Sequence, residues 1–272
     1  MKFGTFVRIN DLSEADAKFK IVKDAGFTAC QVVYKPKEYI MEDAKVIRAA
    51  ADKYGIDISA QFCGQPDNET IWDIYYGYAT AGLNVEAFRE SRVTYIKKAC
   101  EFAKELGLTD CVIHAGYVPN NPFAPEYATM LTSVYAIGKH CQNLGLNLLF
   151  ETGGESPITL LRMIEDVGLD NLYINFDPAN IMMYGYGNPV DALKVFGKYV
   201  RNFHGKDGNL PTDTRHLGKE TPAGQGMVDF PTIFKMFKEL GYDRYCIIER
   251  EITGEQQMKD IIAAKEYFET LV

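Results

Sequence analysis

Short apolar runs alternate along the chain with stretches in which apolar residues recur every three or four positions. The apolar runs predict strands at 3–9, 27–33, 56–63, 110–114, 147–151, 172–177, 200–206 and 245–250. The stretches between them predict helices at 13–24, 42–53, 88–106, 125–143, 157–167, 189–197, 230–240 and 255–270. Glycines follow most of these helices, where left-handed caps are expected, and Ser13 with Asp16 predicts a capping box for the first helix.

Strand and helix thus alternate eight times over 272 residues. Regular alternation of this kind predicts a parallel sheet with helices packed on it. Eight units in a chain of this length predict a fold of the α/β class, a closed (β/α)8 TIM barrel that forms a single domain over 1–272. An open doubly wound sheet is the alternative, but it normally has fewer units or a second domain.

Four successive predicted strands end in side chains that bind metals. The runs NLLFE, LYINFD, VRNFH and YCIIE close on Glu151, Asp177, His204 and Glu249. In a barrel these strands are neighbours, so the four groups converge at one end. Three carboxylates and an imidazole suit one divalent cation, Mn²⁺, Mg²⁺, Co²⁺, Fe²⁺ or Zn²⁺, with positions left open for a ligand. The alternative is a salt-bridge network closed by Arg201, Lys206 or Arg250.

Composition and charge narrow the possible partners. The formal charge is −8, and such a surface repels phosphate backbones, so we expect no nucleic acid partner. No apolar stretch approaches the roughly 18 residues that span a membrane, and the first residues lack the apolar core of a signal peptide. The six cysteines are scattered without a CxxC pair, which is typical of reduced thiols. We therefore expect a soluble, cytoplasmic protein.

Five short motifs carry a family resemblance. They are FETGGE (150–155), NFDPAN (175–180), FHGKDG (203–208), GQGMVDF (224–230) and IIERE (247–251). Together they resemble the xylose-isomerase-like TIM barrel superfamily, which holds sugar isomerases, ketose 3-epimerases, inosose dehydratases and endonuclease IV. The resemblance implies that the family's metal ligands fall on the same four strand-end residues, with Mn²⁺ the expected ion. It also implies that Glu151 and Glu249 are the catalytic acid and base.

The resemblance implies an isomerase or epimerase that removes a proton next to the carbonyl of a keto-sugar or polyol, through a metal-stabilised enediolate. Dehydration of a keto-inositol is one alternative, and a barrel subunit of a larger sugar-processing complex is another. Asn180 stands where family epimerases commonly have a histidine, which weakens assignment to a particular epimerase. The missing histidines of a three-metal site and the acidic charge disfavour an abasic-site endonuclease. We expect a homo-oligomer.

Five side chains are candidates for contact with substrate: Trp72, His114, Asn180, Lys206 and Arg215. Trp72 lies in one long connection, 64–87, and Arg215 in another, 207–229, and both connections follow strands, on the side where barrel enzymes place their sites. Trp72 and nearby tyrosines could stack on a sugar or form an oligomer contact. His114 could instead bond only to backbone, and Arg215 could be a solvated loop charge. No clear phosphate cradle is visible, which favours an unphosphorylated substrate.

Overall fold

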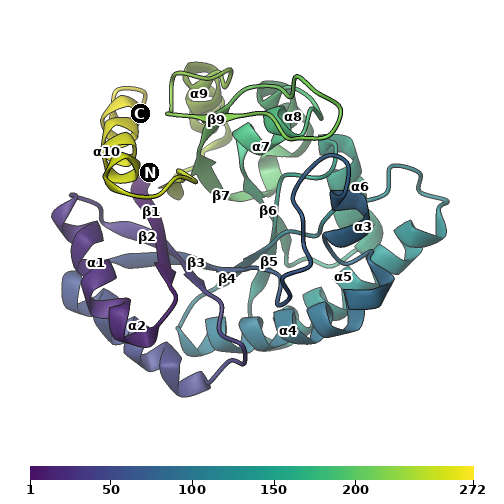
Figure 1. Ribbon diagram of the computed structural model, residues 1–272, viewed down its shortest axis with the longest axis horizontal. Helices are drawn as coiled ribbons and strands as arrows, with labels where there is room; N and C mark the ends of the chain where they lie inside the picture. The colour runs from purple at the N-terminus through teal and green to yellow at the C-terminus, as the bar shows by residue number, and fades with distance from the viewer.

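Eight parallel strands close into a barrel in the computed structural model, which describes residues 1–272. Around the barrel the order is β1, β10, β7, β6, β5, β4, β3 and β2. Their bounds are β1 Lys2–Ile9, β2 Ala29–Tyr34, β3 Asp57–Cys63, β4 Asp110–Ile113, β5 Asn147–Glu151, β6 Leu172–Phe176, β7 Val200–Gly205 and β10 Tyr245–Ile248. The predicted (β/α)8 barrel is confirmed, and the helices surround the strands on the outside (Figure 1).

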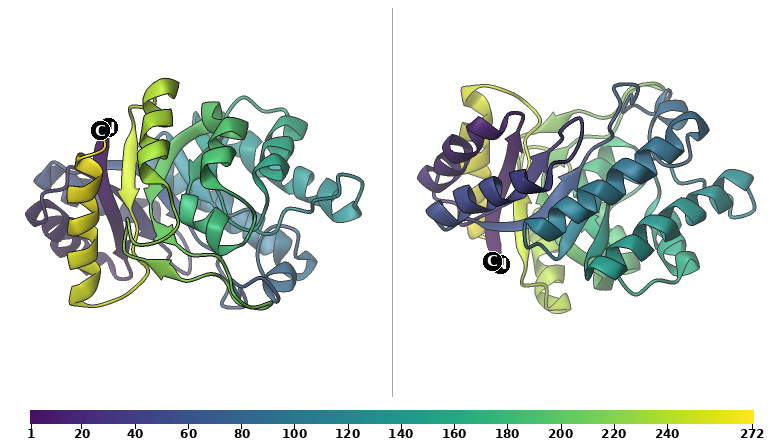
Figure 2. Two further views of the ribbon diagram at one scale, coloured as in Figure 1. Left: turned by 90° about the horizontal axis from the view of Figure 1, so that it is seen from above. Right: turned by 90° about the horizontal axis from the view of Figure 1, so that it is seen from below.

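The outer helices lie within two residues of their predicted bounds. They are α1 Ala15–Asp24, α2 Met41–Tyr54, α4 Glu86–Glu105, α5 Pro125–Leu144, α6 Pro157–Val167, α8 Pro189–Phe196, α9 Phe230–Leu240 and α10 Glu255–Glu269. Shorter elements that the pattern did not predict are η1 Leu12–Glu14, α3 Gly77–Thr80, α7 Pro178–Met183, η2 Gly197–Tyr199 and the antiparallel pair β8 Asp207–Gly208 and β9 Glu220–Thr221. The two chain termini lie side by side beside α10 in all three views (Figures 1 and 2).

The predicted capping box at the start of the first helix is wrong. Asp11 accepts a hydrogen bond from the Ser13 backbone N–H at 2.8 Å and caps η1 instead. α1 then begins at Ala15 without a side-chain cap. The Asp16 side chain turns outward, where its oxygens accept from Lys53 Nζ at 2.6 Å and from the Tyr54 hydroxyl at 3.0 Å. A charged partner on α2 therefore outcompetes the backbone N–H for this carboxylate.

The core lies between the barrel and its helices. A cluster of 62 buried apolar residues joins the outward faces of the strands to the inward faces of the helices. All six cysteines are buried and unpaired, as predicted. No helix has the combination of length and apolar character that crossing a membrane requires. Burial of the strands on both faces explains why they read as continuous apolar runs.

Each of the two long connections is held in shape by one buried charge. The Asp207 carboxylate accepts from the backbone N–H groups of Gly208, Gly224, Gly226 and Val228 at 2.8–3.1 Å, which shapes the connection between β7 and α9. In the connection after β3, the fully buried Arg92 guanidinium donates to both oxygens of Asp67, at 2.8 and 2.9 Å. Both connections therefore form defined walls at the carboxyl end of the barrel.

The second of these connections also meets the segment after β4. Gly82 and Gly116 form an isolated antiparallel bridge, and both have a positive φ, of 93° and 94°. A Cβ on Gly82 would lie 2.3 Å from the Gly116 Cα, so a side chain has no room at either position. This close approach holds the segment that carries Trp72 against the mouth of the barrel.

Candidate metal centre

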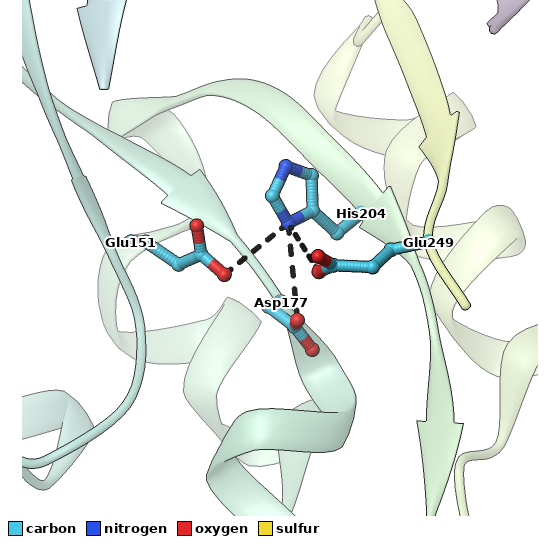
Figure 3. Close-up of side chains that lie close together, drawn as sticks. All are labelled: Glu151, Asp177, His204 and Glu249. Atoms are coloured by element: carbon cyan, nitrogen blue, oxygen red, sulfur yellow. Dashed lines mark ion pairs between the residues drawn. The ribbon is translucent and has the colours of Figure 1, made fainter. Parts of the chain in front are cut away.

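The four strand-end residues meet at one point. Glu151 ends β5, Asp177 follows β6 directly, His204 lies in β7 and Glu249 follows β10. One ligand atom from each lies within 4.8 Å of all the others. Each side chain is buried, with between 0% and 8% of the residue exposed. Figure 3 shows the three carboxylates grouped around one nitrogen of the His204 ring, while the other nitrogen points away. The predicted convergence is therefore present in the fold.

Distances and unpaired lone pairs show that this cluster fits a cation. The His204 Nδ1 atom is 3.3 Å from Glu151 Oε1, 3.8 Å from Asp177 Oδ2 and 3.4 Å from Glu249 Oε2. His204 Nδ1, Glu151 Oε2 and Asp177 Oδ2 are all buried without a hydrogen-bond partner. Buried acceptors left unpaired are costly, and mixed oxygen and nitrogen donors suit a divalent cation. The residues present therefore fit one metal ion.

Polar side chains inside the barrel orient the His204 ring from behind. Its Nε2 atom lies 2.8 Å from Gln31 Oε1 and 3.1 Å from Asn175 Nδ2. Because an amide oxygen only accepts, the contact with Gln31 places a proton on Nε2 and leaves the Nδ1 lone pair free for a metal. Asn202 Nδ2 in turn donates to Asn175 Oδ1 at 2.5 Å. Gln31 comes from β2, across the barrel from β7.

Lys206 and Arg8 supply positive charge beside the three carboxylates. The buried Lys206 Nζ lies 3.5 Å from Glu249 Oε2 and 3.6 Å from Asp177 Oδ2. Arg8, near the end of β1, donates from Nη2 to Glu249 Oε1 at a distance of 3.1 Å. Burial lowers the pKa of Lys206, but the charge of Glu249, followed by that of Asp177, raises this pKa well above its ordinary value. Lys206 therefore stays charged within the site.

The same charges set the protonation of two ligands. Burial acts to raise the pKa of Glu249, but Lys206 and His204 outweigh burial and hold this pKa far below its ordinary value. Burial lowers the pKa of His204, but Glu151 and the other carboxylates outweigh it and raise the pKa well above its ordinary value. Without a metal, the imidazole is therefore protonated and Glu249 is ionised at neutral pH.

The short helix α7 explains how Asp177 and Asn180 share the site. Asp177 Oδ1 accepts from the Asn180 backbone N–H at 2.9 Å and caps α7, which leaves Oδ2 facing the other ligands. The Asn180 side chain donates to Glu151 Oε1 at 3.2 Å and accepts from Lys206 Nζ at 3.3 Å. Asn180 thus bridges a ligand and the buried ammonium, and it positions both.

A pocket of about 230 Å³ opens above the four ligands. His114, Trp72, Asn180 and Lys206 all line it, as do Glu151 and Glu249. His114 Nε2 lies 3.7 Å from Glu151 Oε1, and the centroids of the His114 and Trp72 rings are 4.7 Å apart. Four of the five residues expected to contact substrate are therefore brought together at the ligand cluster.

Arg215 lies elsewhere, as do two of the three residues of the alternative salt-bridge network. The exposed Arg215 guanidinium stacks on the Tyr75 ring, with its carbon 4.3 Å from the ring centroid, and Leu217 lines the pocket in its place. Arg201 pairs with Asp110 at 2.9 Å at the other end of the barrel. Arg250 pairs with Glu220 and Asp260. Of that network only Lys206 reaches the site.

Sequence reasoning missed Arg8, Phe6 and Gln31. Arg8 and Phe6 line the pocket, and Gln31 holds His204 from behind. Arg8 stands near the end of the first predicted strand, so its place at a strand end was an available signal. Gln31 interrupts the second apolar run, and a polar residue inside a buried strand is the only sign it gives. Both residues act through contacts that exist only once the barrel has closed.

The chain matches the family model described as "Xylose isomerase-like TIM barrel" over residues 19–270. An uncharacterised protein of Methanocaldococcus jannaschii is 25% identical over an alignment of 284 positions, which covers 99% of this chain and 90% of that protein. The inosose dehydratase of Geobacillus kaustophilus is 22% identical over 260 residues, which cover 85% of this chain and 80% of that protein.

Two solved structures resemble this one along their whole length. The xylose isomerase domain protein from Planctomyces limnophilus superposes with a TM-score of 0.91 and is 34% identical, covering 99% of this chain and 96% of that one. The 3-keto-D-glucoside 4-epimerase of E. coli superposes with a TM-score of 0.74 and is 17% identical, covering 99% of each chain. At that identity the second likeness shows the fold alone.

Proposed function

We propose that this chain, which belongs to the xylose isomerase-like TIM barrel family, is a divalent-metal-dependent isomerase or epimerase of a keto-sugar or related polyol. The observation that carries the proposal is the buried cluster of Glu151, Asp177, His204 and Glu249, with three of its atoms unpaired. Mn²⁺ is the ion we propose, because oxygen-rich mixed donors with an imidazole suit it. The pocket above the cluster gives a small polyol access to it.

The placement of the two glutamates suits transfer of a proton between the two faces of a substrate. Glu151 comes from β5 and Glu249 from beyond β10, and these strands stand at the two ends of the arc β5, β6, β7, β10. One carboxylate takes the proton next to the carbonyl, and the other returns a proton to the opposite face. A cation in the site would stabilise the negative charge that develops on the substrate oxygens.

The surrounding residues prepare these carboxylates for their roles. Lys206 keeps Glu249 ionised, so this carboxylate is in the form that can take a proton. Lys206 also presents a buried ammonium to the pocket, where it donates to a substrate oxygen. Trp72 and His114 form one aromatic wall, which suits the apolar face of a sugar ring. Proton transfer therefore takes place between two carboxylates that are themselves buried, with 4% of Glu151 and 8% of Glu249 exposed.

Dehydration of a keto-inositol is a second candidate function. The inosose dehydratase of Geobacillus kaustophilus supports it, because that relative covers most of this chain. Dehydration begins with the same removal of a proton next to a carbonyl. A hydroxyl on the neighbouring carbon then takes a proton and leaves as water, which forms a carbon–carbon double bond. Only the fate of that hydroxyl separates the two reactions, so both use the same carboxylates.

Incorporation of deuterium from solvent tests the proposal directly. The protein is incubated in D₂O with ketoses, keto-inositols and 3-keto-glucosides, and with their phosphates, in the presence of Mn²⁺ or of EDTA. We expect label at the carbon beside one carbonyl with Mn²⁺ and none with EDTA. A product of unchanged formula then identifies an isomerase or epimerase, whereas a product lighter by one water molecule identifies a dehydratase. Absence of exchange in the whole panel by Mn²⁺-loaded protein would refute both.

A further inference from the structure

A second cavity, of about 340 Å³, continues from the metal-side pocket. The two share the side chains of Phe62, Trp72 and His114, which form the boundary between them. Beyond this boundary the lining turns polar, with Lys35, Gln65, Asn68 and Thr70. The ligand cluster thus lies at one end of a longer cleft at the carboxyl end of the barrel.

One side chain that lines the second cavity, Gln65, has a polar atom without a hydrogen-bond partner. This residue is only 7% exposed, and its Oε1 atom is buried without any hydrogen bond. Buried amide oxygens in folded proteins are nearly always paired, because an unpaired one loses its bonds to water and gains nothing in return. Gln65 lines the cavity while its Oε1 atom is covered, so a ligand hydroxyl would donate to this oxygen once the amide turns toward the cavity.

The charge of the cavity indicates a neutral ligand. Asp67 also lines it, but both of its oxygens are taken by the buried guanidinium of Arg92, at 2.8 and 2.9 Å. Lys35 is then the one cation in the lining, with no arginine beside it. A phosphate site usually contains several cationic donors such as lysine, or an arginine that binds two phosphate oxygens at once. Amide and hydroxyl groups with aromatic walls instead suit a ring that carries several hydroxyls.

The volumes of the two cavities also favour a ligand that occupies both of them. The metal-side pocket holds about 230 Å³, which is below the roughly 300–1,000 Å³ typical of small-molecule sites. The two cavities together fall within that range. The Trp72 and His114 rings, with centroids 4.7 Å apart and planes inclined at 43°, stand where two linked units would meet.

We infer that the second cavity binds the second sugar ring of a glycoside whose reacting keto-sugar ring lies at the metal centre. This inference rests on the proposed function for the identity of the reacting ring, and it adds the substrate class. Gln65 is the residue that recognises a hydroxyl of the second ring, while Phe62 and Trp72 contact both rings at their junction.

Binding of unreactive sugars tests the inference without requiring turnover. Affinities for glucose and for a set of glucose disaccharides (trehalose, sophorose, laminaribiose, cellobiose, maltose and gentiobiose) are measured on the Mn²⁺-loaded protein by Trp72 fluorescence and by saturation-transfer NMR. We expect at least one disaccharide to bind about ten-fold more tightly than glucose, the gain of roughly one good hydrogen bond. Gln65→Leu should bring the ratio of the two affinities close to one.

The ratio is internal to each sample, so partial unfolding of a variant does not change it. Gln142→Leu is the matched control, because Gln142 lies at the end of α5 that leads into the amino end of β5, away from the cleft. That variant should keep the ratio of the unaltered protein. A ratio near one for every disaccharide, or an unchanged ratio in Gln65→Leu, would overturn the inference. Tighter binding of glucose 6-phosphate than of any disaccharide would also overturn it, in favour of a phosphate subsite. The proposed function fails separately, by absence of deuterium exchange.

Discussion

Replacing Gln31 with leucine tests how the barrel interior prepares His204 for a metal. The Gln31 Oε1 atom is 2.8 Å from His204 Nε2, and both side chains are fully buried. When a metal occupies Nδ1, the neutral ring must carry its proton on Nε2. In the variant this N–H faces leucine carbons and finds no acceptor. The metal-bound protein therefore holds a buried donor without a partner.

The metal-free protein escapes most of this cost. In the variant, the metal-free ring can give up its Nε2 proton and keep the one on Nδ1, which faces the Glu151 and Glu249 oxygens at 3.3 and 3.4 Å. The Nε2 atom can then accept from Asn175 Nδ2 at 3.1 Å. The penalty of an unpaired buried N–H, about 1–3 kcal/mol, thus falls mainly on the metal-bound state. This difference corresponds to roughly 5- to 150-fold weaker metal binding.

Mn²⁺ affinity, measured from the electron paramagnetic resonance signal of the free ion, gives the answer without any substrate. Gln61→Leu is the matched control, because Gln61 also lies fully buried in a barrel strand but contacts Tyr39 at 3.2 Å rather than His204. We expect Gln61→Leu to bind Mn²⁺ like the unaltered protein. If Gln31→Leu bound Mn²⁺ within about two-fold of Gln61→Leu, the proposed role of Gln31 would be refuted.

Three further predictions address the catalytic groups, the pocket wall and a buried acid. Glu151→Gln and Glu249→Gln should each lower deuterium exchange at least about 10²-fold while the circular dichroism spectrum stays unchanged; full exchange in either would contradict the mechanism. Trp72 is the only tryptophan and lines the pocket, so its fluorescence should change with saturating substrate, and a constant signal would count against its place there. Burial raises the pKa of Glu155 to about 8 from its ordinary 4.5, so the folded state holds a proton that the unfolded chain has lost. Stability should therefore fall between about pH 4.5 and 8, by up to about 1.4 kcal/mol per pH unit. In Glu155→Gln, the free energy of unfolding measured in urea should fall less steeply with pH over this range than in the unaltered protein. Equal pH dependence in the two proteins would refute the prediction.

The barrel strands and outer helices were predictable because each is long enough to show its period. Strands buried on both faces read as unbroken apolar runs, and helices that cover them show one apolar face. The short helix α7 escaped prediction because its six residues, PANIMM, are all buried and have no polar face. The strands β8 and β9 have two residues each, too few for any alternation to appear.

The residues of the candidate site likewise divide into those that the sequence pattern revealed and those that it did not. A charged residue at the end of an apolar strand conflicts with its surroundings, and four such conflicts in succession revealed the ligand cluster. Arg8 also stands near a strand end and Gln31 interrupts an apolar run, but their roles depend on partners that lie 241 and 173 positions away in sequence. Arg215 was expected at the substrate, but its guanidinium stacks on the Tyr75 ring at 4.3 Å and does not line the pocket. The expected homo-oligomer and the cytoplasmic location stay predictions.

The cations already present determine what a metal ion would add to this site. Lys206, Arg8 and the protonated His204 face the three buried carboxylates, and Lys206 also pairs with the half-exposed Glu251 at 3.1 Å. A divalent ion held by these residues would replace only the proton on His204 Nδ1, because that lone pair binds either a proton or the metal. Exchange of a single charge for a double one leaves the site more positive by about one charge. An enediolate carries negative charge that the starting sugar lacks, so this excess stabilises the transition state more than the ground state. Lys206 keeps its own charge beside the ligands when a metal binds, so the gain of about one positive charge would remain in the metal-loaded site.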